Sequence, residues 1–218
     1  MREANPFETH YAEYDAWFDR NANVYESELA AVRELLPPPG DWVEIGVGSG
    51  RFASRLGIPI GIEPAVGIAA LARERGVSVI RGKAECLPIQ NESVDAAFLI
   101  TTSCFVDDID RTFNEIARVL RDDGSAIVAF IPKDSPFGEL YGSARQEDRF
   151  FRHATLHTKR RIFDAIEAAG LTVERTVQTL SGTPNRANDR IEPPSEGHDR
   201  GSFVVVRAIK RTSRRQAG

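Results

Sequence analysis

One short segment of this chain carries an acidic residue followed by three glycines at every second position, and these residues are well placed to hold a ligand. Glu44 is followed by Gly46, Gly48 and Gly50, and the apolar run Trp42–Val47 around the acid predicts a strand. Glycine reaches positive φ angles and has no Cβ, so a ligand can approach its backbone closely. A strand that ends in such a loop before a helix is typical of the nucleotide-binding corner of a doubly wound α/β sheet. The segment therefore predicts a nucleotide-like ligand.

A second acid, Glu63, is the last residue of the next predicted strand, Ile58–Glu63. A carboxylate at that strand end can accept hydrogen bonds from both hydroxyls of a ribose. Nicotinamide and flavin sites carry a third glycine where this chain has Arg51, and an arginine would crowd the packing of helix on strand. The residues therefore favour a ribose-containing ligand other than a nicotinamide or flavin dinucleotide. The alternatives are that Glu44 only satisfies loop amides and that Glu63 is a plain surface acid.

Strands alternate with amphipathic helices along the middle of the chain, which implies a parallel sheet with helices on both faces. Further strands are predicted at Val77–Arg81, Val94–Ile100 and Ser125–Ile131, and helices at Arg51–Leu56, at Ala65–Arg75 and after a cap at Asp107 or Asp108. Near the end, a helix that Thr158 caps and Gly170 ends precedes the strands Leu171–Leu180 and Ser202–Ile209, which are joined by a polar segment. Two strands connected without a helix are most simply antiparallel.

The N-terminal segment is predicted to form two helices within residues 7–36, with a capping box at Asn23 and Glu26. Tyr11, Tyr14 and Phe18 follow helical spacing and make one aromatic stripe. The stripe either faces the core or closes over a ligand. We expect a helical cap at residues 1–36, a main domain at 37–210 and a flexible basic tail at 211–218.

The composition of the chain argues against a nucleic-acid-binding protein, a membrane protein and a disulfide-rich protein. The chain has 218 residues with a formal net charge of -4, which disfavours nucleic acid or an anionic membrane as partner. No apolar run is long enough to span a bilayer, and the polar start does not read as a signal peptide. The two cysteines, Cys86 and Cys104, fall in segments that read as buried or half-buried and make no disulfide framework. We therefore expect a cytoplasmic protein with no membrane partner.

Five motifs follow one another in a fixed order. They are Glu44-Ile-Gly46-Val-Gly48-Ser-Gly50, Gly61-Ile-Glu63-Pro64, Gly82-Lys83-Ala84-Glu85-Cys86-Leu87-Pro88, Ser93-Val94-Asp95, and the helix and turn from Glu115 to Gly124. Together they resemble class I S-adenosylmethionine-dependent methyltransferases, most closely the small-molecule type called methyltransferase domain 11. The resemblance implies a Rossmann-like fold, with a doubly wound, mostly parallel seven-stranded sheet, an antiparallel last strand and an N-terminal helical cap.

The resemblance also implies a cofactor, S-adenosyl-L-methionine, which leaves as S-adenosyl-L-homocysteine. Its methionine part would lie beside Gly46 and Gly48, with its α-amino group attracted by Glu44, and Glu63 would hold the ribose diol. The other cofactor residues implied are Ala84 and Glu85 at the adenine, Thr101 and Thr102 over the methionine, and Gly50 and Pro64 nearby. Cys86 departs from the acidic or polar residue common after the Ala-Glu pair.

The implied reaction is transfer of a methyl group to a small organic acceptor by in-line displacement. The candidate residues for contact with the acceptor are Tyr11, Tyr14, Phe18, His153 and His157. Because positioning can supply much of the barrier reduction, no catalytic side chain is assigned. His153 and His157 are spaced i, i+4, but no cysteine or third histidine lies near them, so no metal site is expected.

Other functions fit parts of the same pattern. An RNA or protein methyltransferase on this fold would need a basic face around the site. A nicotinamide-dependent oxidoreductase is opposed by Arg51, Glu44 and the antiparallel end, and a non-catalytic nucleotide-binding module by the intact glycines and Glu63. We expect a monomer or a homodimer.

Overall fold

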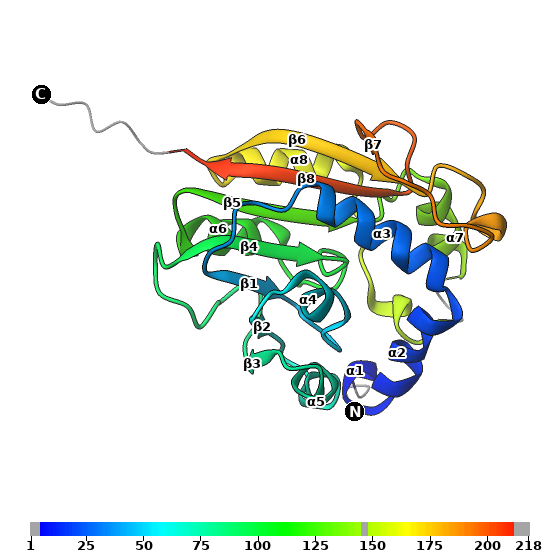
Figure 1. Ribbon diagram of the computed structural model, residues 1–218, viewed down its shortest axis with the longest axis horizontal. Coiled ribbons are helices and arrows are strands. Elements are labelled where there is room, and N and C mark those ends of the chain that lie inside the picture. Colours follow the sequence, from blue (N-terminus) through cyan, green and yellow to red (C-terminus); the bar gives the residue numbers. More distant parts are fainter. Residues whose placement is uncertain (1–4, 145–147, 212–218) are drawn as a thin grey trace, which may run out of the picture.

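The computed structural model describes residues 5–144 and 148–211, and this part of the chain forms one eight-stranded sheet in the order β3-β2-β1-β4-β5-β8-β6-β7 (Figure 1). The strands are β1 (Trp42–Ile45), β2 (Ile60–Ile62), β3 (Ser78–Ile80), β4 (Val94–Ile100), β5 (Leu120–Phe130), β6 (Leu171–Thr179), β7 (Ser195–Glu196) and β8 (Phe203–Lys210). The first five run parallel, and β8 lies antiparallel between β5 and β6. The predicted Rossmann-like α/β fold with an antiparallel end is confirmed.

The number of strands differs from the seven that were predicted. The additional strand is β7, whose two residues pair with Val177 and Gln178 of β6. It lies in the polar segment between β6 and β8, where the sequence has no alternation of apolar and polar residues that would predict a strand. Gln178 reinforces the pairing through its side chain, which donates to the carbonyl of Glu196 and to Asp199 Oδ1.

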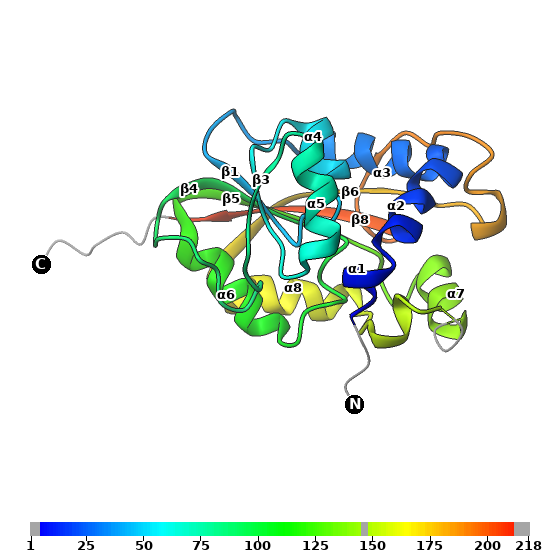
Figure 2. The same cartoon turned by 90° about the horizontal axis from the view of Figure 1, so that it is seen from below.

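Helices cover both faces of the sheet (Figure 2). They are α1 (Pro6–Thr9), α2 (Tyr11–Arg20), α3 (Ala22–Glu34), α4 (Arg51–Leu56), α5 (Val66–Glu74), α6 (Ile109–Val119), α7 (Pro136–Ala144) and α8 (Lys159–Ala168), with short 3-10 turns η1 (Phe151–His153) and η2 (Pro184–Arg186). One face carries α6 and α8, and the other carries α3, α4 and α5. Asp108 and Thr158 cap α6 and α8 as predicted, accepting from the N–H groups of Arg111 and Arg161.

The N-terminal segment forms three helices among the described residues rather than the two that were predicted. The predicted capping box is also wrong, because α3 begins at Ala22 and Asn23 lies inside its first turn. The Asn23 side chain instead donates to the carbonyl of Asn188, and its backbone N–H donates to Asn188 Oδ1. A contact with a distant loop thus replaces the expected local cap.

Helices α1 and α2 lie beyond the carboxyl ends of the parallel strands and pack against α5 (Figure 2). We call these two helices, with Asn5 before them, the lid. Within residues 5–144 and 148–211, no helix combines the length and apolar character needed to cross a membrane. The domain boundaries proposed at residues 36 and 210 stay predictions, and residues 212–218 of the predicted tail lie outside the described residues.

Candidate active site

The loop after β1 has the conformation that its glycines predict. Gly46, Gly48 and Gly50 have φ angles of 71°, 53° and 77°, in the region that favours glycine. At Gly46 a side chain would also clash, because an added Cβ would lie 2.3 Å from Cγ2 of Thr102. The hydroxyl of Thr102 lies 3.1 Å from the Gly46 carbonyl oxygen, so this residue, which follows β4, holds the loop in place.

Glu63 reaches across from the end of β2 to the same loop. Its Oε2 accepts a hydrogen bond from the N–H of Gly48 at 3.0 Å, and its Oε1 accepts one from the N–H of Ala65 at 2.9 Å. The side chain is buried, and this burial raises the pKa of the carboxyl while the two backbone hydrogen bonds oppose the rise. A carboxylate has about four acceptor sites, so these two bonds leave capacity for two further donors.

Glu44 lies below the loop with 2% of its surface exposed. Burial raises the pKa of its carboxyl well above the ordinary value, opposed by a hydrogen bond from the backbone of Ala53 in the first turn of α4. Its second oxygen, Oε2, is buried and has no hydrogen-bond partner among the described residues. An unsatisfied carboxylate oxygen in such a place suits a cationic or N–H donor from a ligand.

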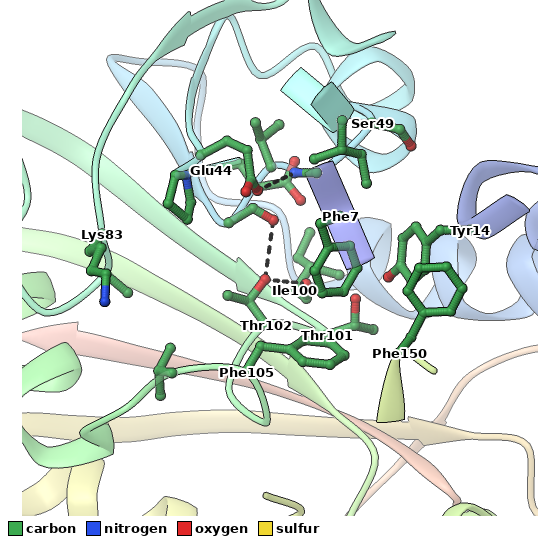
Figure 3. A pocket seen from close by; sticks show the side chains of 18 of the residues that line it. Phe7, Tyr14, Glu44, Ser49, Lys83, Ile100, Thr101, Thr102, Phe105 and Phe150 are labelled. Atoms are coloured by element: carbon green, nitrogen blue, oxygen red, sulfur yellow. Dashed lines mark hydrogen bonds between the residues drawn. The ribbon is translucent and has the colours of Figure 1, made fainter. Parts of the chain in front are cut away.

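These residues line one cavity of about 530 Å³ (Figure 3). All of the predicted cofactor residues except Gly50 border it: Glu44, Gly46, Gly48, Glu63, Pro64, Ala84, Glu85, Thr101 and Thr102. Gly50 instead caps α4, where a Cβ would lie 2.9 Å from Cα of Ala72 on α5. Its role in the structure is to let two helices approach each other.

The segment after β4 forms the floor of the cavity. Thr101 has a φ of 52°, which is unusual for a threonine and is the kind of strain found at functional sites. Glu85 holds the far end of this segment, because its Oε1 accepts from the N–H of Asp107 at 2.6 Å. The carboxylate of Glu85, a residue predicted to flank the adenine, therefore already accepts a backbone hydrogen bond with one oxygen.

The lid is fastened over the cavity by charged groups. Glu8 of α1 accepts from the first N–H groups of α5, those of Val66 and Gly67, at 3.0 and 2.9 Å. Arg51 donates to both carboxylate oxygens of Asp15 at 2.9 Å, and it also pairs with Asp19. The arginine that replaces the dinucleotide glycine therefore joins α2 to the helix that follows the glycine loop.

A second cavity of about 300 Å³ lies beside the first. The two share Tyr14, Phe18, Thr101, Phe105 and Phe150, so these side chains form a common wall. The remainder of the second cavity is lined by Trp17, Tyr141, Phe151, Cys104 and several charged residues, including Glu28 on α3. A small cavity lined by aromatic and charged side chains, next to a nucleotide-type cavity, has the properties of a site for a second substrate.

The five residues predicted to contact an acceptor do not come together. Tyr14 and Phe18 line both cavities, His153 lines the first and His157 the second. Tyr11 lines neither cavity and lies against Gly67 of α5. The two histidines belong to a 3-10 turn and to the extended chain after it, and the described residues contain no group of three or more metal-ligating side chains.

Several site residues were missed by the sequence reasoning. Phe7, Phe105 and Phe150 line the first cavity with Tyr14 (Figure 3). Phe7 is in edge contact with both Tyr14 and Phe105 at 5.1 Å, and Phe150 lies 5.3 Å from Tyr14 between ring centroids. No sequence spacing links these rings, because they come from three separate segments. The sequence could have indicated Glu28, because this acid interrupts the apolar face of α3. Cys86 was expected to be buried or half-buried and is exposed, whereas Cys104 is buried.

Comparison with known proteins agrees with this geometry. A family model described as Methyltransferase domain matches residues 43–128. A solved structure from Thermotoga maritima, described as a SAM-dependent methyltransferase and possible histamine N-methyltransferase, has a TM-score of 0.90 at 42% sequence identity, over 94% of this chain and 98% of that one. An uncharacterized protein of Methanocaldococcus jannaschii is 32% identical over 94% of this chain and 99% of its own length.

A malonyl-[acyl-carrier protein] O-methyltransferase of Methylococcus capsulatus is 29% identical over 73% of this chain and 62% of its own length. A putative methyltransferase of Haloferax volcanii, solved in complex with the Trm112 activator, has a TM-score of 0.70 at 18% identity, and this likeness concerns the fold alone. The chain belongs to the class I S-adenosylmethionine-dependent methyltransferases. Membership of this family implies S-adenosylmethionine as the methyl donor.

Proposed function

We propose that the protein transfers a methyl group from S-adenosylmethionine to a small organic acceptor. The observation that carries the proposal is the buried Oε2 of Glu44 on the wall of the first cavity, which has no hydrogen-bond partner among the described residues. The α-amino group of the cofactor is a cationic donor and would supply the missing partner. The residues present thus fit the cofactor that the family implies.

The other first-cavity residues fit the same cofactor. Glu63 has acceptor capacity beyond its bonds to Gly48 and Ala65, and its place at the end of β2 suits a ribose diol. Ala84 and Glu85 border the cavity where adenine is expected, and Thr101 and Thr102 border it on the methionine side. These assignments come from the family resemblance and from the position of each residue on the cavity wall.

The cofactor, when bound, supplies a methyl group already activated on a sulfonium, so the protein has little covalent chemistry to perform. Its residues bind, orient and exclude water. The glycine loop and Thr102 fix the backbone around one substrate, and the aromatic wall of Tyr14, Phe105 and Phe150 separates the two cavities. Holding two substrates in reacting geometry can supply roughly 7 to 11 kcal/mol of the barrier reduction.

A small acceptor is supported by the second cavity, which has a volume of about 300 Å³ and whose lining includes Trp17, Tyr141 and Phe151. The Thermotoga maritima structure, described as a possible histamine N-methyltransferase, is consistent with an acceptor of this size. The malonyl-[acyl-carrier protein] O-methyltransferase leaves a carrier-bound acceptor as an alternative. An RNA acceptor is disfavoured by the net charge of -4.

Isothermal calorimetry with S-adenosylmethionine, S-adenosylhomocysteine and NAD tests the proposal. We expect micromolar binding of both sulfur compounds and none of NAD. Binding of NAD without binding of S-adenosylmethionine would overturn the assignment. A screen of amines, thiols and phenols for methyl acceptance, with histamine included, then identifies the reaction.

A further inference from the structure

The second cavity contains a buried acid, Glu28, that has no partner among the residues the structure describes. Glu28 lies in the middle of α3 and lines this cavity with 3% of its surface exposed. Within the described part of the chain its carboxyl makes no hydrogen bond and no ion pair, and burial is the one cause that raises its pKa, to about 8. A buried acid without a partner destabilises a fold. Its presence is explained if a ligand supplies the partner.

Several aromatic side chains line the same cavity as this carboxyl. Tyr14 and Tyr141 line the same cavity as Glu28, and burial raises the pKa of both phenols. Tyr141 stacks on Phe151 with ring centroids 4.5 Å apart, and Trp17 lines the same space. Ring faces around a carboxylate attract a cation, because the π-electrons and the acid both present negative charge.

The other charged residues of the cavity lie toward solvent and most are already engaged. Glu13 and Arg149 pair with each other at 3.5 Å, with 53% and 44% of their side chains exposed. Asp148 accepts from the N–H groups of Phe150 and Phe151. Arg20 is exposed at the surface. The buried part of the cavity therefore holds an acid that a bound cation can ionise and, among the residues described, no lysine or arginine.

We propose that the methyl acceptor is a small organic amine and that Glu28 binds its cationic nitrogen in the second cavity. This inference rests on the proposed function. Glu28 lines only the second cavity, whereas Tyr14, Thr101, Phe105 and Phe150 line both. The amine is thus anchored away from the first cavity, and the atom that receives the methyl group is the part of the molecule nearest the shared wall.

Three probes of similar shape and different charge test this inference. The protein, saturated with S-adenosylhomocysteine, is titrated with 2-phenylethylamine, 2-phenylethanol and 3-phenylpropionate by calorimetry, with Trp17 fluorescence as a second signal. We expect the amine to bind at least tenfold more tightly than the alcohol, and the acid not to bind. Equal binding of all three, or no binding of the amine, overturns the proposal.

A matched pair of variants locates the interaction. Glu28→Gln keeps the shape of the side chain and removes its charge, and we expect it to weaken amine binding at least tenfold while alcohol and S-adenosylhomocysteine binding stay unchanged. Glu34→Gln, at the exposed end of the same helix, is the control and should change none of these affinities. The thermal midpoint of Glu28→Gln should not fall, because a buried acid without a partner among the described residues is replaced by an amide of the same shape that cannot ionise. An unchanged amine affinity in Glu28→Gln would contradict the role given to this residue.

The pH dependence of binding gives a readout that a purely structural role would not move. Below pH 8 Glu28 is largely protonated in the free protein, so binding of an ammonium group should release a proton at pH 7 and none at pH 9. The other titratable or charged groups among the described lining residues are Glu13, Arg20, Asp148 and Arg149, together with four whose pKa burial shifts. Burial lowers the pKa of His157, raises that of Cys104 to about 12, and raises those of the Tyr14 and Tyr141 phenols. Calorimetry in two buffers of different ionisation enthalpy measures the number of protons released on binding. If Glu28→Gln still released a proton on binding the amine, the proton would come from another group.

Failure of this inference and failure of the proposed function give different results. If S-adenosylhomocysteine binds and the amine shows no preference, the methyltransferase proposal stands and the acceptor class is wrong. If S-adenosylhomocysteine does not bind, the proposed function itself fails, whatever the second cavity takes.

Discussion

Glu63 and Gly48 join two neighbouring strand ends through one hydrogen bond of 3.0 Å, from the loop N–H to the carboxylate Oε2. The acid therefore acts on the free protein as well as on a ligand, because it fixes the loop that borders the first cavity. A carboxylate that already orders the loop needs no rearrangement to receive a ribose. This double role separates Glu63 from Glu44, whose Oε2 has no partner in the described chain.

Replacement of Glu63 should therefore reduce stability and cofactor affinity together. In Glu63→Ala the N–H groups of Gly48 and Ala65 lose their acceptor, and we expect a loss of about 1–3 kcal/mol in the free energy of unfolding. We expect S-adenosylhomocysteine binding to weaken by about 1.5–3 kcal/mol, the scale of a hydrogen bond to a charged group. Urea unfolding and calorimetry measure the two effects. Glu74→Ala, at an exposed position of α5, is the control, and an unchanged affinity in Glu63→Ala would remove the ribose role.

Replacement of Glu44 should reduce cofactor affinity without reducing stability. Burial disfavours the charged carboxylate, so Glu44→Gln should leave the thermal midpoint unchanged or raise it. The same change should weaken S-adenosylmethionine binding by about 1.5–3 kcal/mol, because the α-amino group loses its charged acceptor. Calorimetry and thermal unfolding of Glu44→Gln and Glu28→Gln side by side provide the test. Only the first variant should lose cofactor affinity, and an equal loss in both would show a general effect of buried acids.

The attachment of the lid should depend on pH through Asp15. Burial alone would raise the pKa of this carboxyl, but hydrogen bonds from Arg51, Ser49 and Arg75 lower it to about 2. A group with a lowered pKa contributes stability that is complete above its ordinary pKa of 3.8 and is lost as the pH falls toward 2. We expect the lid to be released in that range, and limited proteolysis with pepsin should detect the release.

At neutral pH, Asp15→Asn should mimic this release and weaken lid closure by about 1.5–3 kcal/mol. Tryptic cleavage after Arg20, together with S-adenosylhomocysteine affinity, measures the effect. Asp19→Asn is the matched control, because Asp19 binds the same arginine with 67% of its side chain exposed, whereas Asp15 is 13% exposed. Exposed ion pairs contribute little, so similar effects of the two variants would contradict the proposed fastening.

The sequence predicted the parts of the site that one chain segment carries. The glycine loop, Glu44 and Glu63 lie within about twenty residues of one another, and the apolar strands around them place them reliably at one sheet edge. The aromatic wall could not be predicted in the same way, since Phe7, Phe105 and Phe150 meet only through the tertiary fold. Tyr11 illustrates the limit of periodicity, which gave the correct helix but not the neighbour that its side chain contacts.

Two glycines that flank α4 provide a test of how the loop is packed. Gly50 and Gly57 have φ angles of 77° and 74°, so an alanine at either position costs about 1–2 kcal/mol in backbone strain. At Gly57 no atom of the described residues lies within 4 Å of the added Cβ, whereas at Gly50 the Cβ would lie 2.9 Å from the backbone of Ala72. Gly50→Ala should therefore lose a further 1–3 kcal/mol, roughly the cost of overpacking, because α5 must move. Urea unfolding of the two variants measures the difference, and equal losses would mean that α5 moves away without cost.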